Sequence, residues 1–70
     1  MGQVLASAIV NVVRAATPQK IGIFDVEVWG KAPYDYTRHY EIMAKNDTIA
    51  AQEGIRRFVK EMELLPIEGE

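Results

Sequence analysis

The first quarter of the sequence is almost entirely apolar, and this segment restricts the possible folds more than any other feature. Ten residues of the segment 4–16 are apolar, and only Ser7, Asn11 and Arg14 interrupt them. A chain of 70 residues forms one small domain at most, and a domain near this size buries only about 60% of the surface that its unfolded chain exposes. The sequence therefore predicts a single small domain over residues 1–70 that covers its own apolar surface poorly.

Small domains usually gain the missing stability from disulfides, a structural metal or association with other chains. The sequence has no cysteine and a single histidine, His39, so disulfides are excluded and no metal site is expected. We expect no cofactor either, because no nucleotide or cofactor motif occurs in the sequence. Association with other protein chains is the support that remains.

The apolar N-terminal segment is interpreted as a helix. Its polar residues Gln3, Ser7, Asn11 and Arg14 follow one another at spacings of four, four and three, which would align them in one narrow stripe of a helix. A strand would mix polar and apolar residues on the same face, which is a poorer pattern. Pro18 follows the segment, and the residue before a proline is disfavoured in a helix. The sequence therefore predicts an N-terminal apolar helix that ends before Pro18.

The next segment, residues 20–31, predicts a strand. Apolar and acidic side chains alternate along it, Phe24, Val26 and Val28 with Asp25 and Glu27, as in a strand with one buried face. No other segment has an equally clear strand pattern. Because unpaired backbone groups cost roughly 1 to 3 kcal/mol each when they are buried, we expect this strand to pair with another chain.

The C-terminal half predicts two helices, over 35–45 and 48–65. Tyr36, Tyr40 and Met43 fall at helical spacing in the first, and the polar residues 46–48 separate it from the second or form a kink in one continuous helix. The second has the clearest amphipathic pattern in the chain, and Gly54 within it indicates a close backbone contact. The expected fold is therefore α+β, a short α-β-α-α chain.

A strand over 21–29 followed by helices over 35–45 and 48–65 resembles the order of elements in the ribbon-helix-helix repressors. In that family the strands of two chains pair and enter the major groove of DNA, which would provide a partner for the single strand. The family presents basic or polar side chains from this strand, whereas Asp25 and Glu27 stand here and would repel phosphates. The resemblance therefore implies an architectural alternative, a homo-oligomer of the ribbon-helix-helix kind.

Two groups of residues could carry chemistry. Asp35 and His39 are four residues apart and could touch on a helix, as a general base held by a carboxylate does, but no pattern marks a nucleophile beside them. A metal site would need a third ligand, and Glu41 would not share their face. Asp25 and Glu27 lie on one strand face, where paired carboxylates more often face solvent or match a basic partner. We therefore predict no catalytic residue, no metal ligand and no enzyme activity.

Composition restricts the partner and the compartment. The net charge is −2 and the eight basic residues are spread along the chain, so nucleic acid is an unlikely partner. The apolar run is shorter than the roughly 20 consecutive residues of a transmembrane helix. The absence of cysteine fits an intracellular location. No acidic residue precedes Asp25, which is also typical of organelle-targeting segments, so cytoplasmic and mitochondrial locations both stay open.

These observations together predict a small, non-enzymatic accessory subunit that docks on a larger protein assembly. The alternative is a homo-oligomeric binding protein that takes a small ligand or DNA. The docking surfaces would be the apolar helix, the strand edge and a corner rich in tyrosine, since aromatic residues are enriched in interfaces. The predicted interface residues are Val4, Leu5, Ile9, Val12, Val13, Phe24, Val26, Val28, Trp29, Tyr34, Tyr36 and Tyr40.

Overall fold

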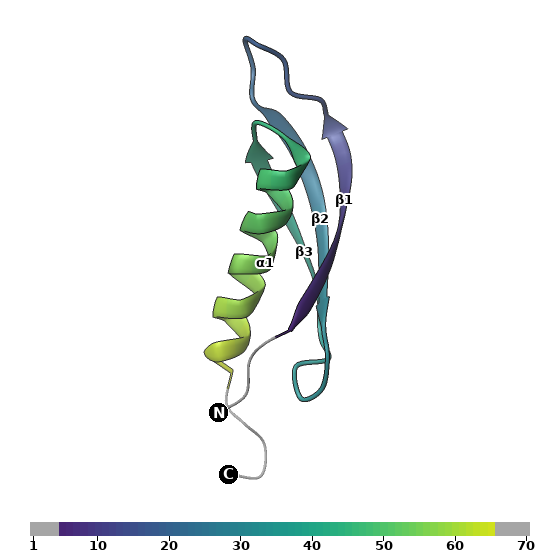
Figure 1. The fold of residues 1–70 in the computed structure, drawn as a ribbon, viewed down its shortest axis with the longest axis vertical. Helices are drawn as coiled ribbons and strands as arrows, with labels where there is room; N and C mark the ends of the chain where they lie inside the picture. The colour runs from purple at the N-terminus through teal and green to yellow at the C-terminus, as the bar shows by residue number, and fades with distance from the viewer. Residues whose placement is uncertain (1–4, 66–70) are drawn as a thin grey trace.

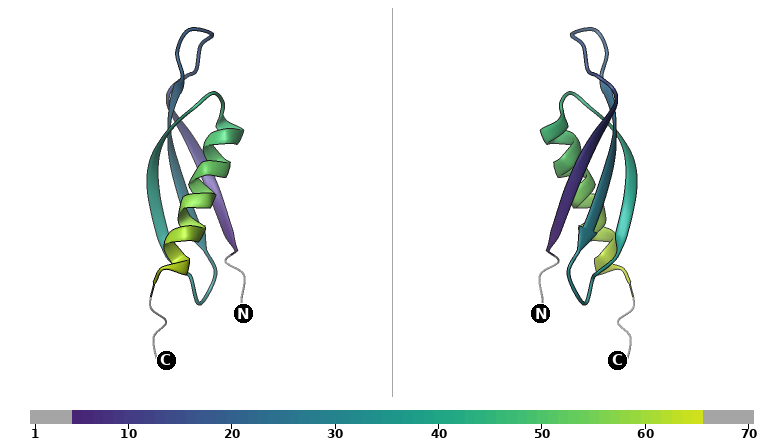
Figure 2. Two further views of the ribbon diagram at one scale, coloured as in Figure 1. Left: turned by 90° about the vertical axis from the view of Figure 1, so that its left-hand side faces the viewer. Right: turned by 90° about the vertical axis from the view of Figure 1, so that its right-hand side faces the viewer.

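The chain folds into a three-stranded antiparallel sheet followed by one helix (Figure 1). The structure, a computed structural model, describes residues 5–65. The strands are β1 (Ala6–Arg14), β2 (Gly22–Gly30) and β3 (Thr37–Ala44), in the sheet order β1-β2-β3. The helix α1 (Asp47–Glu63) lies against one face of this sheet, and no element covers the other face in the described part of the chain (Figure 2).

The predicted N-terminal helix is wrong, because this segment forms β1. Ala6, Ala8 and Val10 alternate along β1 with residues on the opposite face, and they pack against the core beside α1. The intervening Ser7 and Ile9 are exposed. The many β-branched residues of this segment favour a strand, and an edge strand with only one covered face can mix polar and apolar residues on the other.

The prediction that the central strand pairs with another chain is also wrong. β2 pairs antiparallel with β1 on one edge and with β3 on the other, so both rows of its backbone groups have partners within the chain. Phe24 illustrates this position, since it lies opposite Val12 of β1 and Ile42 of β3. A hairpin connection therefore supplies the pairing that we expected from a second molecule.

The helix predicted over 35–45 does not form either, and β3 takes its place. Tyr40 of β3 lies on the side of the sheet that faces α1, whereas Met43 lies on the other side. Their helical spacing therefore does not correspond to a shared face. Residues 5–65 contain three strands followed by one helix, which is not the strand-helix-helix order of the ribbon-helix-helix repressors.

The C-terminal helix lies where the sequence predicts it. Asn46 is its N-cap, and the side-chain oxygen of Asn46 accepts a hydrogen bond of 2.8 Å from the backbone nitrogen of Ile49. The glycine in the helix, Gly54, meets the sheet directly, because a Cβ atom built there would lie 2.6 Å from Cγ1 of Val26. The close contact predicted from Gly54 is thus confirmed.

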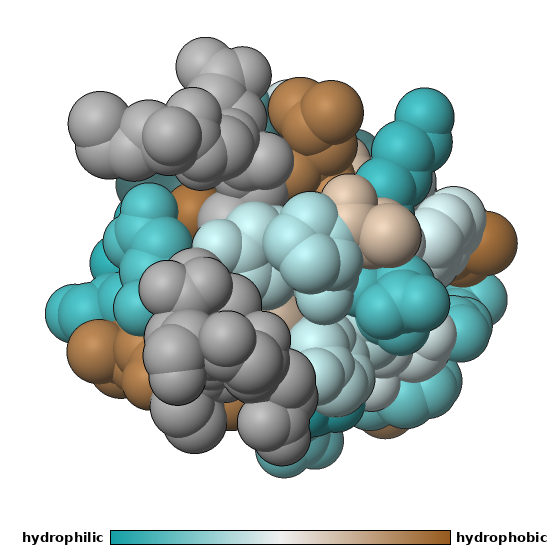
Figure 3. Space-filling view, turned by 90° about the horizontal axis from the view of Figure 1, so that it is seen from below, coloured by the Kyte–Doolittle hydropathy of each residue, from teal (hydrophilic) through white to brown (hydrophobic). Residues whose placement is uncertain are grey.

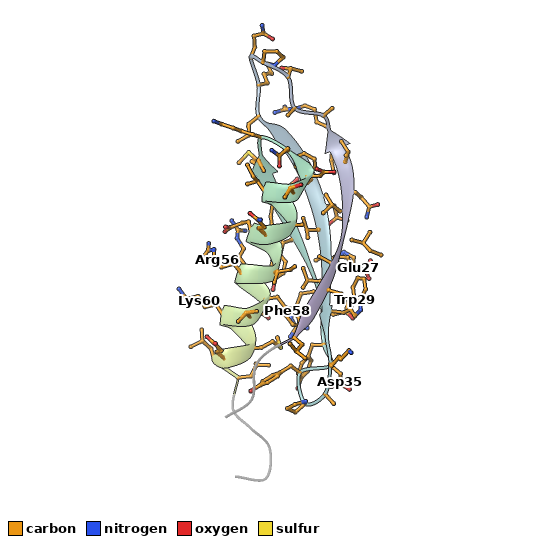
Figure 4. The ribbon with its side chains drawn as sticks, in the orientation of Figure 1. Glu27, Trp29, Asp35, Arg56, Phe58 and Lys60 are labelled. Atoms are coloured by element: carbon orange, nitrogen blue, oxygen red, sulfur yellow. The ribbon has the colours of Figure 1, made fainter. Side chains whose placement is uncertain are left out.

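The core lies between α1 and the sheet. Phe58 of the helix points from α1 toward the sheet (Figure 4) and is fully buried. It belongs to a cluster of eight buried residues, which are Phe24, Val26, Val28, Ile42, Ala44, Ala50, Phe58 and Met62. One helix therefore covers the centre of the sheet, and the class remains α+β although the order of the elements differs from the expectation.

Candidate functional site

The face of the sheet opposite α1 has no covering element in the described residues. The pairing register arranges its side chains in rows across the three strands. Glu27 and Trp29 project from β2 on this side, away from α1 (Figure 4). We call this surface the open face, and its residues are Ser7, Ile9, Asn11, Ile23, Asp25, Glu27, Trp29, Thr37, His39, Glu41 and Met43.

Three carboxylates and one imidazole occupy neighbouring positions at the centre of the open face. Asp25 lies directly opposite Glu41 across β2 and β3, and Glu27 lies opposite His39. The Nδ1 atom of His39 is 3.8 Å from Oδ2 of Asp25, and its Nε2 atom is 4.0 Å from Oε2 of Glu27. We call these four residues the acidic centre.

The acidic centre does not gain much from its own contacts. Like charges directly opposite each other on a sheet are destabilising, and this holds for Asp25 and Glu41. The His39 side chain is 60% exposed, and ion pairs at such exposed positions contribute about 0 to 1 kcal/mol. The arrangement therefore has unused capacity to bind a positive charge.

Large apolar side chains flank the acidic centre. Ile9 is in the same row as Glu27, and Met43 is next to the row of Asp25 and Glu41. Ile9 is 51% exposed and Met43 is 67% exposed. Trp29, half-buried, lies two positions from Glu27 on β2. The open face thus combines negative charge at its centre with apolar groups on both sides.

The structure separates the predicted interface residues into several groups. Phe24, Val26 and Val28 belong to the core under α1 and have almost no exposed surface with which to contact another chain. Val4 lies outside the described residues. Ile9 and Trp29 are on the open face.

The remaining predicted residues of the N-terminal segment lie on or beside β1. Leu5, which immediately precedes β1, is exposed. Val12 and Val13 are exposed as well, at the end of β1 where the pairing with β2 is interrupted by a bulge. These three residues remain candidates for contact with another chain.

The tyrosines that we predicted as a docking corner have different environments. Tyr34 packs partly against the core, and Tyr36 is exposed with its ring centroid 5.4 Å from the guanidinium carbon of Arg38. In the view from the end that holds the β2–β3 loop, hydrophilic, intermediate and hydrophobic areas are interspersed (Figure 3). Because Tyr34 packs against the core while Tyr36 is exposed, the tyrosines do not share one environment.

Tyr40 participates in a hydrogen-bonded link between β3 and α1. Its hydroxyl donates to Oε1 of Glu61 at 2.8 Å, and Nε of Arg38 donates to Oε2 of the same carboxylate at 2.7 Å. Burial, together with the hydrogen bond to Glu61, raises the pKa of Tyr40 to about 12. The hydrogen bonds from Arg38 and Tyr40 lower the pKa of Glu61. This cluster stabilises the fold and is not part of the open face.

The expected contact between Asp35 and His39 does not form, because Asp35 lies in the β2–β3 loop and His39 lies in β3. His39 instead meets Asp25 and Glu27 from the neighbouring strand. The sequence placed these two carboxylates on one face of a strand, which the structure confirms. The approach of His39 and Glu41 depends on the pairing register of β3, and no local pattern indicated it.

Two other features of the described residues, the acidic side chains and the β1–β2 loop, do not form a site. Within residues 5–65, no three His, Cys, Asp or Glu side chains lie close enough together to hold a metal ion. A concavity of about 380 Å³ lies at the β1–β2 loop, lined by residues 16–21 and Lys45. Because one loop forms nearly all of its wall, this concavity is a consequence of the bent hairpin.

No family model, curated protein or solved structure matches this chain. Among the described residues, the structure has no helix that is both long enough and apolar enough to cross a membrane. The geometry and chemistry of the open face are therefore the basis for assigning a function.

Proposed function

We propose that this protein is a non-enzymatic accessory subunit that docks on another protein through the open face. The partner presents lysine or arginine side chains to the acidic centre and apolar side chains to Ile9, Trp29 and Met43. The observation that carries the proposal is a sheet face on which three solvent-accessible carboxylates lie between the exposed side chains of Ile9 and Met43.

The two kinds of group contribute differently to such a complex. Burying a large apolar side chain contributes about 1.5 to 3 kcal/mol, so Ile9 and Met43 provide affinity. Complementary charges contribute mainly to the rate of association and to the choice of partner. The facing pair Asp25 and Glu41 would bind a basic side chain better than either carboxylate alone, because a positive charge also relieves their repulsion.

The exposure of the acidic centre supports binding rather than catalysis. The side chains of His39, Asp25 and Glu27 are 60%, 42% and 38% exposed. Catalytic acids and bases usually lie in clefts, where burial shifts their pKa values and excludes water. A flat, exposed face offers a reacting group neither property.

The alternative function is a homo-oligomeric binding protein. Its DNA-binding form has little support, since the open face carries the carboxylates of Asp25, Glu27 and Glu41, which repel phosphates. Its homo-oligomeric form depends on a different surface, the outer edge of β1.

Site-directed photo-crosslinking in cells of the native source tests the proposal. A photoreactive amino acid at Met43, an exposed residue of β3 away from the β1 edge, reports on the open face. The same amino acid at Arg56 reports on the exposed side of α1, which points away from the sheet (Figure 4). We expect a specific protein adduct at Met43 and none at Arg56. The adduct identifies the partner, which can then be purified.

The binding measurement that follows uses charge reversal with a matched control. The double variant Asp25→Lys with Glu41→Lys should bind the purified partner at least tenfold more weakly, a loss of about 1.4 kcal/mol. Glu63→Lys changes charge at an exposed position of α1 and should bind normally. Crosslinking only through α1, or an affinity that charge reversal leaves unchanged, contradicts the proposal.

A further inference from the structure

The outer edge of β1 has no partner strand in the described part of the chain. The sheet order β1-β2-β3 makes β1 and β3 the two edge strands. Natural proteins usually protect such edges with charged side chains, prolines or bulges, because an open edge is a template for pairing. β3 carries Arg38, His39 and Glu41, whereas β1 has no charged residue before Arg14 at its end.

The helix leaves β1 less covered than the other two strands. Val12, Phe24 and Ile42 form one row across the sheet on the side of α1. Phe24 is 3% exposed and Ile42 is 2% exposed, but Val12 is 59% exposed. An apolar side chain that points to the core side of the sheet is thus left in contact with solvent at the β1 edge.

The same edge is uncharged on both faces. On the side of α1, Ala8 and Val10 are only partly buried where they pack against the core. On the open face, Ser7, Ile9 and Asn11 are exposed, and none of them is charged. A strand that is itself uncharged can therefore pair with this edge without placing a charge against it.

We propose that the outer edge of β1 pairs antiparallel with β1 of a second copy of this chain. A two-fold axis perpendicular to the sheet then joins the two sheets into one of six strands, with both helices on the same face. A second copy fits because its β1 edge is also uncharged, so no charge opposes the pairing. The contact runs along the outer edge of β1, whose residues Ser7, Ile9 and Asn11 also border the open face, but this inference does not rest on the proposed function.

A register centred on Ile9 gives matched pairs of side chains. Because antiparallel partners point to the same face of a sheet, Ile9 would lie opposite Ile9 of the partner subunit. Ala8 would lie opposite Val10 of the partner subunit, and Ala6 opposite Val12 of the partner subunit. Small residues thus face larger ones along the side of α1, and the exposed Val12 gains cover.

The size of the contact sets the expected affinity. The nine residues of β1 rise about 3.3 Å each, which gives an edge about 30 Å long, and the molecule measures 14 and 15 Å along its two short axes. The contact is therefore about 400 Å² per copy, roughly half the area of a standard specific interface. We expect a weak dimer that exchanges with the monomer at micromolar or higher concentration.

Sedimentation equilibrium over a wide range of protein concentration tests this dimer. The wild-type chain should change from monomer to dimer as its concentration rises. Val12→Lys adds a charge at the β1 edge, and Met43→Lys adds the same charge at an equally exposed apolar position of β3. Val12→Lys should weaken dimerisation at least tenfold, and Met43→Lys should leave it unchanged, with circular dichroism confirming the fold of each.

A cysteine variant tests the register, since the natural sequence contains no cysteine. Under mild oxidation, Ile9→Cys should form a disulfide-linked dimer with native circular dichroism, whereas Met43→Cys should stay monomeric. A wild-type chain that is monomeric at every concentration, or a dimer that Val12→Lys leaves intact, overturns the pairing. A dimer that Val12→Lys weakens but that Ile9→Cys does not crosslink overturns the register centred on Ile9.

Discussion

Glu61 links α1 to β3 through two hydrogen bonds, and this link is the strongest polar contact between helix and sheet in the described chain. Its carboxylate accepts from Arg38 and from the hydroxyl of Tyr40. Charge-assisted hydrogen bonds of this kind are shorter and stronger than neutral ones. The apolar contacts of the core place α1 over the sheet, and this carboxylate fixes its position along β3.

We expect Tyr40→Phe to lower the free energy of unfolding by about 1 kcal/mol, because it removes one hydrogen bond and keeps the ring. The folded-state pKa of Tyr40, about 12, lies above its ordinary value of 10.0. Its contribution is therefore complete below pH 10 and is lost as the pH rises toward 12. Urea unfolding across this range should show a weaker alkaline loss in the variant. Tyr36→Phe, at an exposed ring, serves as the control, and an equal effect of both changes would count against this role.

Two glutamates of α1 make the stability of the fold depend on pH in the acid range. Hydrogen bonds from Arg56 and Arg57 lower the pKa of Glu53 from 4.5 to about 2, and Arg38 lowers that of Glu61. A carboxylate with a depressed folded-state pKa stabilises the fold above its ordinary pKa and loses this effect as the pH falls. We expect stability to decline from about pH 4.5 toward pH 2.

The variants Glu53→Gln and Glu61→Gln should each make this acid decline shallower in urea unfolding experiments. Glu63→Gln, at an exposed position of the same helix, should leave the pH profile unchanged. A wild-type stability that stays constant between pH 4.5 and pH 2 would contradict the lowered pKa values.

At the scale of the elements, β2 and α1 could be predicted because each has a single regular pattern. β2 alternates apolar and acidic residues between a buried and an open face, and α1 repeats its apolar residues at helical spacing after the Asn46 cap. In both, one face meets the core and the other meets water, so the burial pattern is visible in the residues themselves.

The two edge strands could not be predicted, because neither has a regular pattern of apolar and polar residues. The open face of β1 mixes the apolar Ile9 with the polar Ser7 and Asn11, so apolar and polar residues do not alternate along this strand. In β3, Tyr40 and Met43 lie at helical spacing by coincidence, and both faces carry polar as well as apolar residues. Their strand conformation follows from pairing with β2, which is a tertiary contact that no local pattern contains.

Gly54 determines how closely α1 approaches the sheet. A Cβ atom there would lie 2.6 Å from Cγ1 of the fully buried Val26, so Gly54→Ala forces the helix outward. Alanine gains about 1 kcal/mol of helix propensity, but overpacking a core costs about 1 to 3 kcal/mol. We therefore expect a net loss of about 1 kcal/mol in thermal or urea unfolding. Gln52→Ala, at an exposed position of α1, is the control, and a stabilised Gly54→Ala would show that the helix moves freely.

At the scale of the whole molecule, the surface that could bind partners differs from the one expected from the sequence. The sequence suggested an apolar helix and an unpaired strand that 70 residues could not cover. The structure pairs β2 on both edges and buries its core side under α1. The surfaces left uncovered in the described chain are the open face and the outer edge of β1, instead of the apolar helix and the unpaired strand that the sequence predicts.

If the acidic centre binds a partner as proposed, its charges reduce the stability of the fold in exchange for binding. Asp25 and Glu41 face each other across two strands, and a sheet selected only for stability would not keep this pair. We expect Glu41→Gln to raise the free energy of unfolding by a few tenths of a kcal/mol, because it removes a cross-strand repulsion. The gain should shrink as salt is added, since salt screens exposed charges, and Glu63→Gln should give no comparable gain. If Glu41→Gln also weakens binding of the crosslinked partner, Glu41 contributes to the interaction at a cost in stability. If Glu41→Gln instead destabilises the chain, the carboxylate supports the fold and the acidic centre has a structural role.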